Sequence, residues 1–131
     1  MMKIGDAAKA SGLSAKTIRY YESIGLLSSH RLDNGYRDYG ARDLAALKFL
    51  QRARTLGFSI EDSRSLLTLQ QNPARASASV KRVAEQRLAH LESQIKELHA
   101  MQATLRELVQ QCPGDSSADC AILDGLTGSP D

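Results

Sequence analysis

The chain has 131 residues, of which 42% are hydrophobic and 24% charged, and its net charge is +2. This composition is typical of a globular protein, and the length predicts one small domain with an appended element. No apolar run is long enough to cross a bilayer, and the first residues lack the apolar stretch of a secretory signal, so we expect a cytoplasmic protein that is not a membrane protein. Few aromatic residues and many good helix formers predict helices rather than a sandwich or barrel.

The charge is unevenly distributed along the chain. Residues 1–69 contain 11 Lys and Arg against 7 Asp and Glu, whereas residues 70–131 contain 6 against 8. A basic N-terminal half favours a polyanionic partner, although a balance of +4 also fits a solvated surface.

The first 25 residues have the outline of a helix-turn-helix. Ala8 is small enough to let two helices approach, Gly12 suits the turn, and Ile18 can hold the second helix against the first. Ser14 can cap the second helix, which Gly25 ends. Together these spacings predict a DNA-binding motif.

A hairpin is predicted next. Residues 34–35 are Asn-Gly, the preferred two-residue hairpin turn, and Tyr36 and Arg37 follow on the returning strand. With Arg31 and Tyr39 nearby, the hairpin is interpreted as a basic, aromatic wing beside the second helix. The alternative is a surface hairpin whose arginines are only solvated.

Two further helices follow the hairpin. One is predicted from residue 41 to about 55 and ends at Gly57, and the other begins after a Ser59 cap and ends at residues 72–73. Both are interpreted as core helices. The candidates for phosphate contact within them are Arg52 and Arg54.

The third region, residues 77–111, is predicted to be one long helix of roughly 50 Å. Its apolar side chains recur in steps of three and four and form a heptad seam that requires a partner helix, so we expect a homodimer built on a coiled coil. His90 and His99 are expected to be exposed, since their spacing matches no zinc site. The seam comprises Ala84, Leu88, Leu91, Ile95, Leu98, Gln102, Leu105 and Val109.

The second helix of the motif is the predicted recognition helix. Because Ile18 faces the core, Lys16, Thr17, Arg19 and Tyr20 project toward solvent or a major groove, with donors that suit phosphates and base edges.

Four sequence motifs carry a resemblance to a known family. TIRYYE at 17–22, GLL at 25–27, NGYRDY at 34–39 and LGF at 56–58, followed by the long helix, resemble the MerR family of transcriptional regulators. The resemblance covers nearly the whole chain.

The resemblance implies a homodimer of winged helix-turn-helix heads joined by an antiparallel coiled coil, with an effector site after the coil. Such regulators are not enzymes. They bind double-stranded promoter DNA with an overlong spacer and, with effector bound, bend and underwind it for RNA polymerase. By position, the resemblance implies DNA contacts from the recognition helix and wing through Lys16, Thr17, Arg19, Tyr20, Tyr36 and Arg37.

The expected fold class is all-α, with a small two-stranded wing and a C-terminal metal-binding loop. We expect a DNA-binding domain at 1–70, a dimerisation helix at 77–111, and a loop and tail at 112–131.

Cys112 and Cys120 are separated by seven residues, which matches no zinc ribbon, C-x-x-C redox site or iron–sulfur set. Two thiolates suffice for a two-coordinate, near-linear site, which suits Cu(I), Ag(I) and Au(I). From spacing alone, ordinary thiols or a disulfide remain open alternatives.

The loop resembles that of the copper efflux regulators within the family. That resemblance implies a metal site at Cys112 and Cys120, with Ser77 in place of a third Cys and Lys81 offsetting the negative charge of the thiolates. Ser77 could instead be a helix cap and Lys81 a solvated charge.

We therefore expect a Cu(I)-responsive activator of copper efflux or detoxification promoters. The alternatives are an Ag(I) or Au(I) sensor of the same family, a dithiol redox enzyme or switch, and a coiled-coil adaptor without a DNA role.

Overall fold

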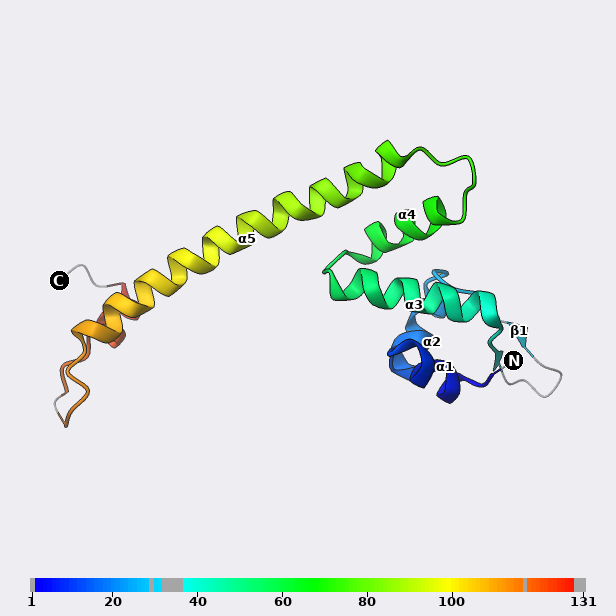
Figure 1. Ribbon diagram of the computed structural model, residues 1–131. Coiled ribbons are helices and arrows are strands. Elements are labelled where there is room, and N and C mark those ends of the chain that lie inside the picture. The colour runs from blue at the N-terminus through cyan, green and yellow to red at the C-terminus, as the bar shows by residue number, and fades with distance from the viewer. Residues whose placement is uncertain (1, 29, 32–36, 117, 129–131) are drawn as a thin grey trace. The chain divides into compact units, whose positions relative to one another are not determined.

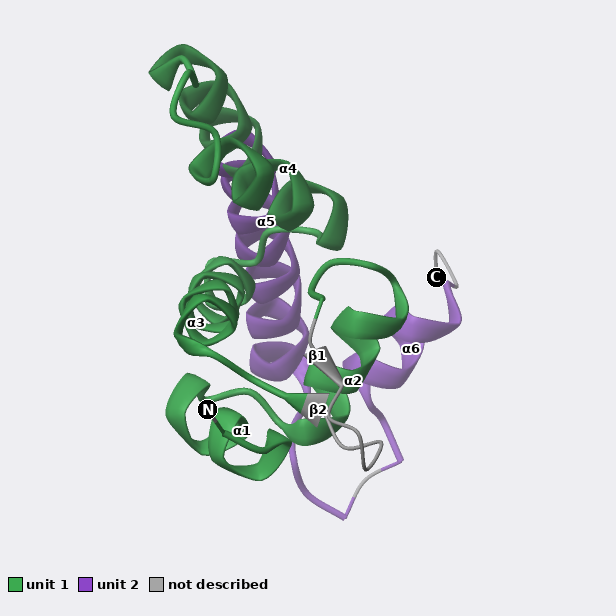
Figure 2. Ribbon diagram, turned by 90° about the vertical axis from the view of Figure 1, so that its right-hand side faces the viewer, with its two compact units in different colours: residues 1–87 green, residues 88–131 purple. Residues whose placement is uncertain are grey.

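The computed structural model describes residues 2–28, 30–31, 37–116 and 118–128, and it is mostly helical, as predicted (Figure 1). Two compact units, 1–87 and 88–131, divide the chain inside its long helix (Figure 2). This division does not test the predicted domain boundaries, which stay a prediction. In chain order the elements are α1 (Ile4–Ser11), α2 (Ala15–Ser23), β1 (His30–Arg31), β2 (Arg37–Asp38), α3 (Ala41–Thr55), α4 (Ile60–Gln70), α5 (Ser77–Gln111) and α6 (Ala121–Thr127).

The helix-turn-helix formed by α1 and α2 has the predicted signals at its turn. Gly12 ends α1 in the left-handed conformation, with φ of 80°. The Ser14 side chain accepts a hydrogen bond from the Thr17 N–H at 3.1 Å, so Ser14 caps α2. Both predictions are confirmed, and they fix where the recognition helix begins.

The core of the first unit orients α2. Ile18 on α2 is fully buried, as are Leu47 and Leu50 on α3 and Tyr39 after β2, at 0–1% exposure. Burying an aliphatic side chain of this size contributes about 1.5–3 kcal/mol. Rotating α2 to expose Ile18 would therefore be costly, and the opposite face of α2 is held toward solvent.

Helix α4 is attached to the end of α2. Arg64 donates a hydrogen bond from Nη2 to the Ile24 carbonyl oxygen at 2.8 Å. A cation at a helix C-terminus is favoured by the helix dipole. This bond ties α4 to the helix-turn-helix.

The two short strands pair antiparallel, with His30 opposite Asp38 and Arg31 opposite Arg37. Residues 32–36, which include the predicted turn at 34–35, lie outside the described residues, so the wing stays a prediction. Tyr39, which the sequence grouped with the wing, is instead buried, and its backbone pairs with that of Met2 at 2.8 and 2.9 Å. Its hydroxyl donates to the Glu22 carboxylate, so Tyr39 anchors the end of the hairpin.

Helix α5 has the predicted bounds, 77–111, and its 35 residues correspond to about 52 Å. None of the side chains along it is buried, and several seam residues are largely exposed, including Leu98 at 61% and Val109 at 59%. Within the described ranges, none of the helices has the length and apolar character that a bilayer span requires.

The turn between α3 and α4 is closed by a residue of α5. Gly57 has φ of 79°, and the preceding Leu56 carbonyl accepts a hydrogen bond from Arg87 Nε at 3.0 Å. A Cβ on Gly57 would lie 2.8 Å from Arg87 Cζ. Position 57 therefore disfavours a side chain through its left-handed backbone, and a Cβ there would also require the Arg87 side chain to move.

We predict that Gly57→Ala lowers the free energy of unfolding by roughly 1–3 kcal/mol, because the left-handed backbone and the Arg87 side chain both oppose a methyl group. Urea denaturation at fixed protein concentration measures the change. Gly5→Ala is the matched control, because Gly5 lies in α1 and an added Cβ would have no atom within 4 Å. Alanine at this position should raise the free energy of unfolding by about 0.5–1 kcal/mol. Equal effects of the two substitutions would contradict the steric argument.

Candidate functional site

The outward face of α2 carries the predicted DNA contacts. Lys16, Arg19 and Tyr20 are exposed, with Tyr20 at 52%, and Thr17 is half-buried. These side chains project away from the core as the position of Ile18 requires. Their roles toward DNA stay a prediction.

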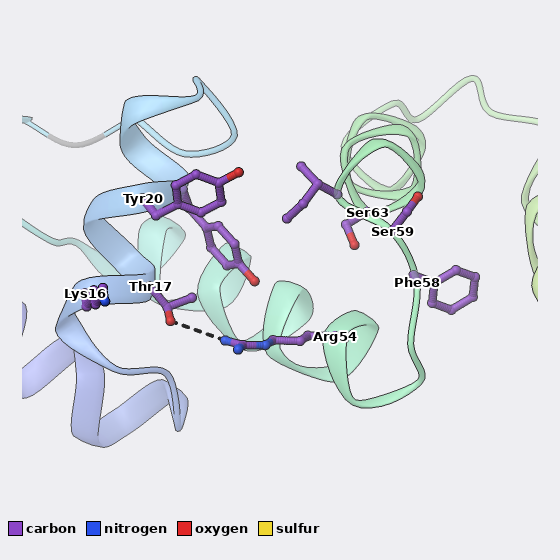
Figure 3. Close-up of a pocket in the computed structure, with 9 residues that line it drawn as sticks. Lys16, Thr17, Tyr20, Arg54, Phe58, Ser59 and Ser63 are labelled. Atoms are coloured by element: carbon purple, nitrogen blue, oxygen red, sulfur yellow. Dashed lines mark hydrogen bonds between the residues drawn. The ribbon is translucent and has the colours of Figure 1, made fainter. Parts of the chain in front are cut away.

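A cavity of about 600 Å³ opens beside this face, between α2, α3 and α4 (Figure 3). Lys16 and Thr17 line it from α2, Arg54 reaches it from α3, and Ser59 lies at the start of α4. Arg54 Nη1 donates a hydrogen bond to Thr17 Oγ1 at 3.3 Å, and Ser14 Oγ donates to the same oxygen at 2.9 Å. The recognition helix and α3 are thus joined at the edge of the predicted DNA surface.

The electrostatics of this cavity favour an anion. Lys16 and Arg54 bring positive charge beside the first turn of α2, where unpaired backbone N–H groups and the helix dipole also attract negative groups. Helix α4 begins on the same cavity with Ser59, whose side chain accepts from the Asp62 N–H at 3.0 Å. The Lys16 and Arg54 side chains suit phosphates of a nucleic-acid backbone, whereas the first turn of α4 carries Glu61 and Asp62 and does not add to that attraction.

The structure separates the two arginines that the sequence suggested for phosphate contact. Arg54 lies with the recognition helix, whereas Arg52 lines a different depression with Phe49 and Gln70. Sequence reasoning missed Ser59 and Phe58 as neighbours of the recognition helix. The LGF motif and the cap at Ser59 marked the segment, but only the fold brings it to α2.

The two predicted DNA contacts in the wing are Tyr36 and Arg37. Tyr36 lies outside the described residues, and Arg37 is the first residue of β2. Their predicted DNA contacts stay a prediction.

A second candidate site lies after α5. Cys112 directly follows the helix, and Cys120 is the residue before α6. Both are half-buried free thiols, and the Cys112 Sγ donates to the Cys120 Sγ across 3.8 Å. A disulfide needs a separation of about 2.05 Å, so the sulfurs are adjacent but unbonded. The fold therefore brings the predicted ligands together.

The surroundings of Cys120 favour its thiolate form. Hydrogen bonding to the Leu123 N–H lowers the pKa of Cys120 below its ordinary value, and the Cys112 thiol and the Ile122 N–H act in the same direction. Partial burial and the Asp124 carboxylate oppose the shift. A lowered pKa increases the fraction of the nucleophilic, metal-binding form.

Ser77 and Lys81 lie at the other end of the long helix. A capping side chain belongs to the residue just before a helix, whereas Ser77 is the first residue of α5 itself. The side chains of Ser77 and Lys81 are both exposed. In the part of the chain that the structure describes, no three His, Cys, Asp or Glu side chains form a metal-binding group.

Residues 2–70 match the family described as MerR HTH family regulatory protein, and residues 44–108 match the family described as MerR, DNA binding. The chain belongs to the MerR family of DNA-binding transcription regulators. Its relatives are regulators, which confirms the prediction that it is not an enzyme.

Similarity extends along almost the full chain. The transcriptional regulator HmrR of Rhizobium leguminosarum bv. viciae is 49% identical, over 96% of this chain and 98% of that protein. The regulator CueR of Escherichia coli O6:H1 is 44% identical, over 97% of this chain and 95% of that protein. The crystal structure of PbrR691 from Ralstonia metallidurans CH34 with lead(II) matches at 32% identity, with a TM-score of 0.81, over 96% of this chain and 99% of that one.

We predict that Arg54→Ala weakens operator binding about tenfold and reduces the slope of log affinity against log salt by about one, the change expected for one lost phosphate contact. A salt series of DNA-binding isotherms measures both quantities. Arg52→Ala is the matched control, since it removes the same charge from the same helix but outside the α2 cavity. If the two variants bind alike, the cavity beside Thr17 is not part of the DNA surface.

Proposed function

We propose that this protein is a metal-responsive MerR-family regulator that binds Cu(I) through Cys112 and Cys120 and activates copper efflux or detoxification promoters. The observation that carries the proposal is the 3.8 Å approach of two free thiols directly after the long helix, one with a lowered pKa. The similarity to HmrR and CueR supports the same conclusion. Ag(I) or Au(I) is the alternative ion. The expected cytoplasmic location remains part of this proposal.

The donor set fits a soft monovalent ion. Two thiolates are soft ligands, which select Cu(I) over hard divalent ions. Cys112 and Cys120 would hold the ion between their sulfurs, which already lie adjacent at 3.8 Å. When bound, the ion supplies two thiolate bonds that connect the end of α5 to the start of α6.

Homodimerisation follows from the exposed seam of α5. Leu88, Ile95 and Leu105 are 46–54% exposed, and a helix with such a seam is stabilised when a second copy covers it. In an antiparallel pair, the first turn of one α5 lies beside the last turn of the other. Ser77 and Lys81 of the partner subunit would then lie near Cys112, where Lys81 offsets the single net negative charge of Cu⁺ with two thiolates.

The dimer also gives a physical basis for regulation at the promoter. Two recognition helices held by one coiled coil engage two half-sites of a duplex at a fixed separation. Bending or untwisting a site of 20–30 base pairs costs on the order of 1–6 kcal/mol, so effector binding must favour the distorted complex by a comparable amount. Distortion brings the promoter elements on either side of an overlong spacer into register for RNA polymerase.

A redox switch is the second candidate, because adjacent thiols with a lowered pKa also exchange disulfides readily. The cysteine variants distinguish the two functions.

We predict that Cys112→Ser and Cys120→Ser each abolish Cu(I)-dependent transcription, because each removes one of the two metal ligands. Operator affinity should change less than about threefold, because neither substitution alters the DNA-binding domain. In vitro transcription and operator binding are measured on the same preparations. Retained copper induction in either variant would falsify the two-thiolate site. Induction of the parent by an oxidant without metal would identify a redox switch instead.

We predict that Ser77→Cys raises the response to Hg(II) or Zn(II) at least about tenfold relative to Cu(I), because a third thiolate completes a shell that divalent ions prefer. Metal competition and transcription with reduced protein measure the ranking. Ser79→Cys is the matched control, as it adds the same thiol about 200° around α5. An unchanged ranking with Ser77→Cys would place selectivity within the loop itself.

A further inference from the structure

Helix α6 contains a glycine that its backbone conformation does not require. Gly125 lies inside the helix Ala121–Thr127, and it is not among the glycines with positive φ. Glycine is a poor helix former, since it loses more conformational freedom on folding than alanine does. The backbone conformation therefore does not require glycine at this position.

The space at Gly125 is filled by α5. A Cβ built on Gly125 would lie 2.9 Å from Leu108 Cδ2 and 3.2 Å from Leu108 Cδ1, the two ends of that side chain, so either the leucine must rotate or α6 must move. Leu108 is half-buried, unlike its neighbours on the last turns of α5. The chain reverses after α5 so that α6 returns beside its end (Figure 1), and Gly125 makes this close approach possible.

The contact lies one helical turn from both sulfurs. On α5, the Cys112 N–H donates to the Leu108 carbonyl at 3.1 Å, so Leu108 is one turn before Cys112. On α6, the Asp124 N–H donates to the Cys120 carbonyl at 3.1 Å, so Gly125 is just over one turn after Cys120. A displacement of α6 at Gly125 can therefore shift Cys120 relative to Cys112, because about one turn of backbone joins each contact residue to its cysteine.

We propose that Gly125 and Leu108 form a positioning pair that sets the separation of Cys112 and Cys120. Their packing holds the sulfurs 3.8 Å apart before any ligand binds, so little ordering remains to be done on binding. The effect on metal affinity rests on the proposed function. The effect on the separation of the thiols does not.

A double-mutant cycle tests the pair, using the full-length parent, Gly125→Ala, Leu108→Ala and the double variant. Gly125→Ala should weaken Cu(I) binding about tenfold, measured by competition with a Cu(I) chelator, because the methyl group displaces α6. Leu108→Ala removes the opposing side chain, so the double variant should bind within about threefold of Leu108→Ala. Helix propensity alone predicts the opposite effect of Gly125→Ala, since alanine would stabilise α6 and tighten Cu(I) binding.

A second readout needs no metal. Oxidised glutathione accepts two electrons from Cys112 and Cys120, forming their disulfide and releasing two glutathione thiols. The equilibrium constant of this exchange reports how readily the sulfurs meet. It should fall at least about threefold in Gly125→Ala relative to the parent, and the double variant should match Leu108→Ala. Operator affinity should stay at the parental value in all four proteins.

The two readouts distinguish failure of the positioning pair from failure of the copper function. If the parent responds to Cu(I) but Gly125→Ala equals it in both assays, Leu108 rotates away freely and the positioning pair is refuted. If the parent fails to bind Cu(I) but the exchange shows the coupling, the pair stands and the copper function falls.

Discussion

The exposed apolar seam of α5 is the constraint on which the rest of the molecule depends. A helix of 35 residues without a buried side chain leaves its apolar seam exposed, and a second surface that covers the seam would stabilise it. That surface, in our proposal, is an identical helix. Pairing then does three things at once: it stabilises α5, it doubles the DNA-binding head, and it brings the start of one helix to the cysteine loop of another.

Much of the local structure could be predicted from sequence because the signals are local. Ser14 and Gly12 mark the turn of the helix-turn-helix through their own backbone chemistry, and the bounds of α5 follow from a heptad pattern. Tyr39 was misplaced for the same reason. Its position in the chain groups it with the wing, but burial against the head and a bond to Glu22 decide where it lies.

The sites were less predictable, because they depend on contacts between distant residues. Spacing alone could not show that Cys112 and Cys120 approach each other, since a loop of seven residues has many conformations. Nor could it show that Arg54 bonds Thr17 while Arg52 does not share that cavity. In both cases the sequence shows which residue types are present, and the packing of the helices determines which of their side chains lie close together.

The contact of Arg87 with the Leu56–Gly57 turn has a consequence for how this sequence can evolve. Leu56 and Arg87 are 31 positions apart, yet the guanidinium occupies the volume that any side chain at 57 would need. A substitution at 57 would require the end of the Arg87 side chain to move away from the Leu56 carbonyl, and would still meet the cost of a left-handed backbone. Position 57 is therefore expected to stay glycine across homologues, whereas position 87 can drift among long side chains that still reach the Leu56 carbonyl.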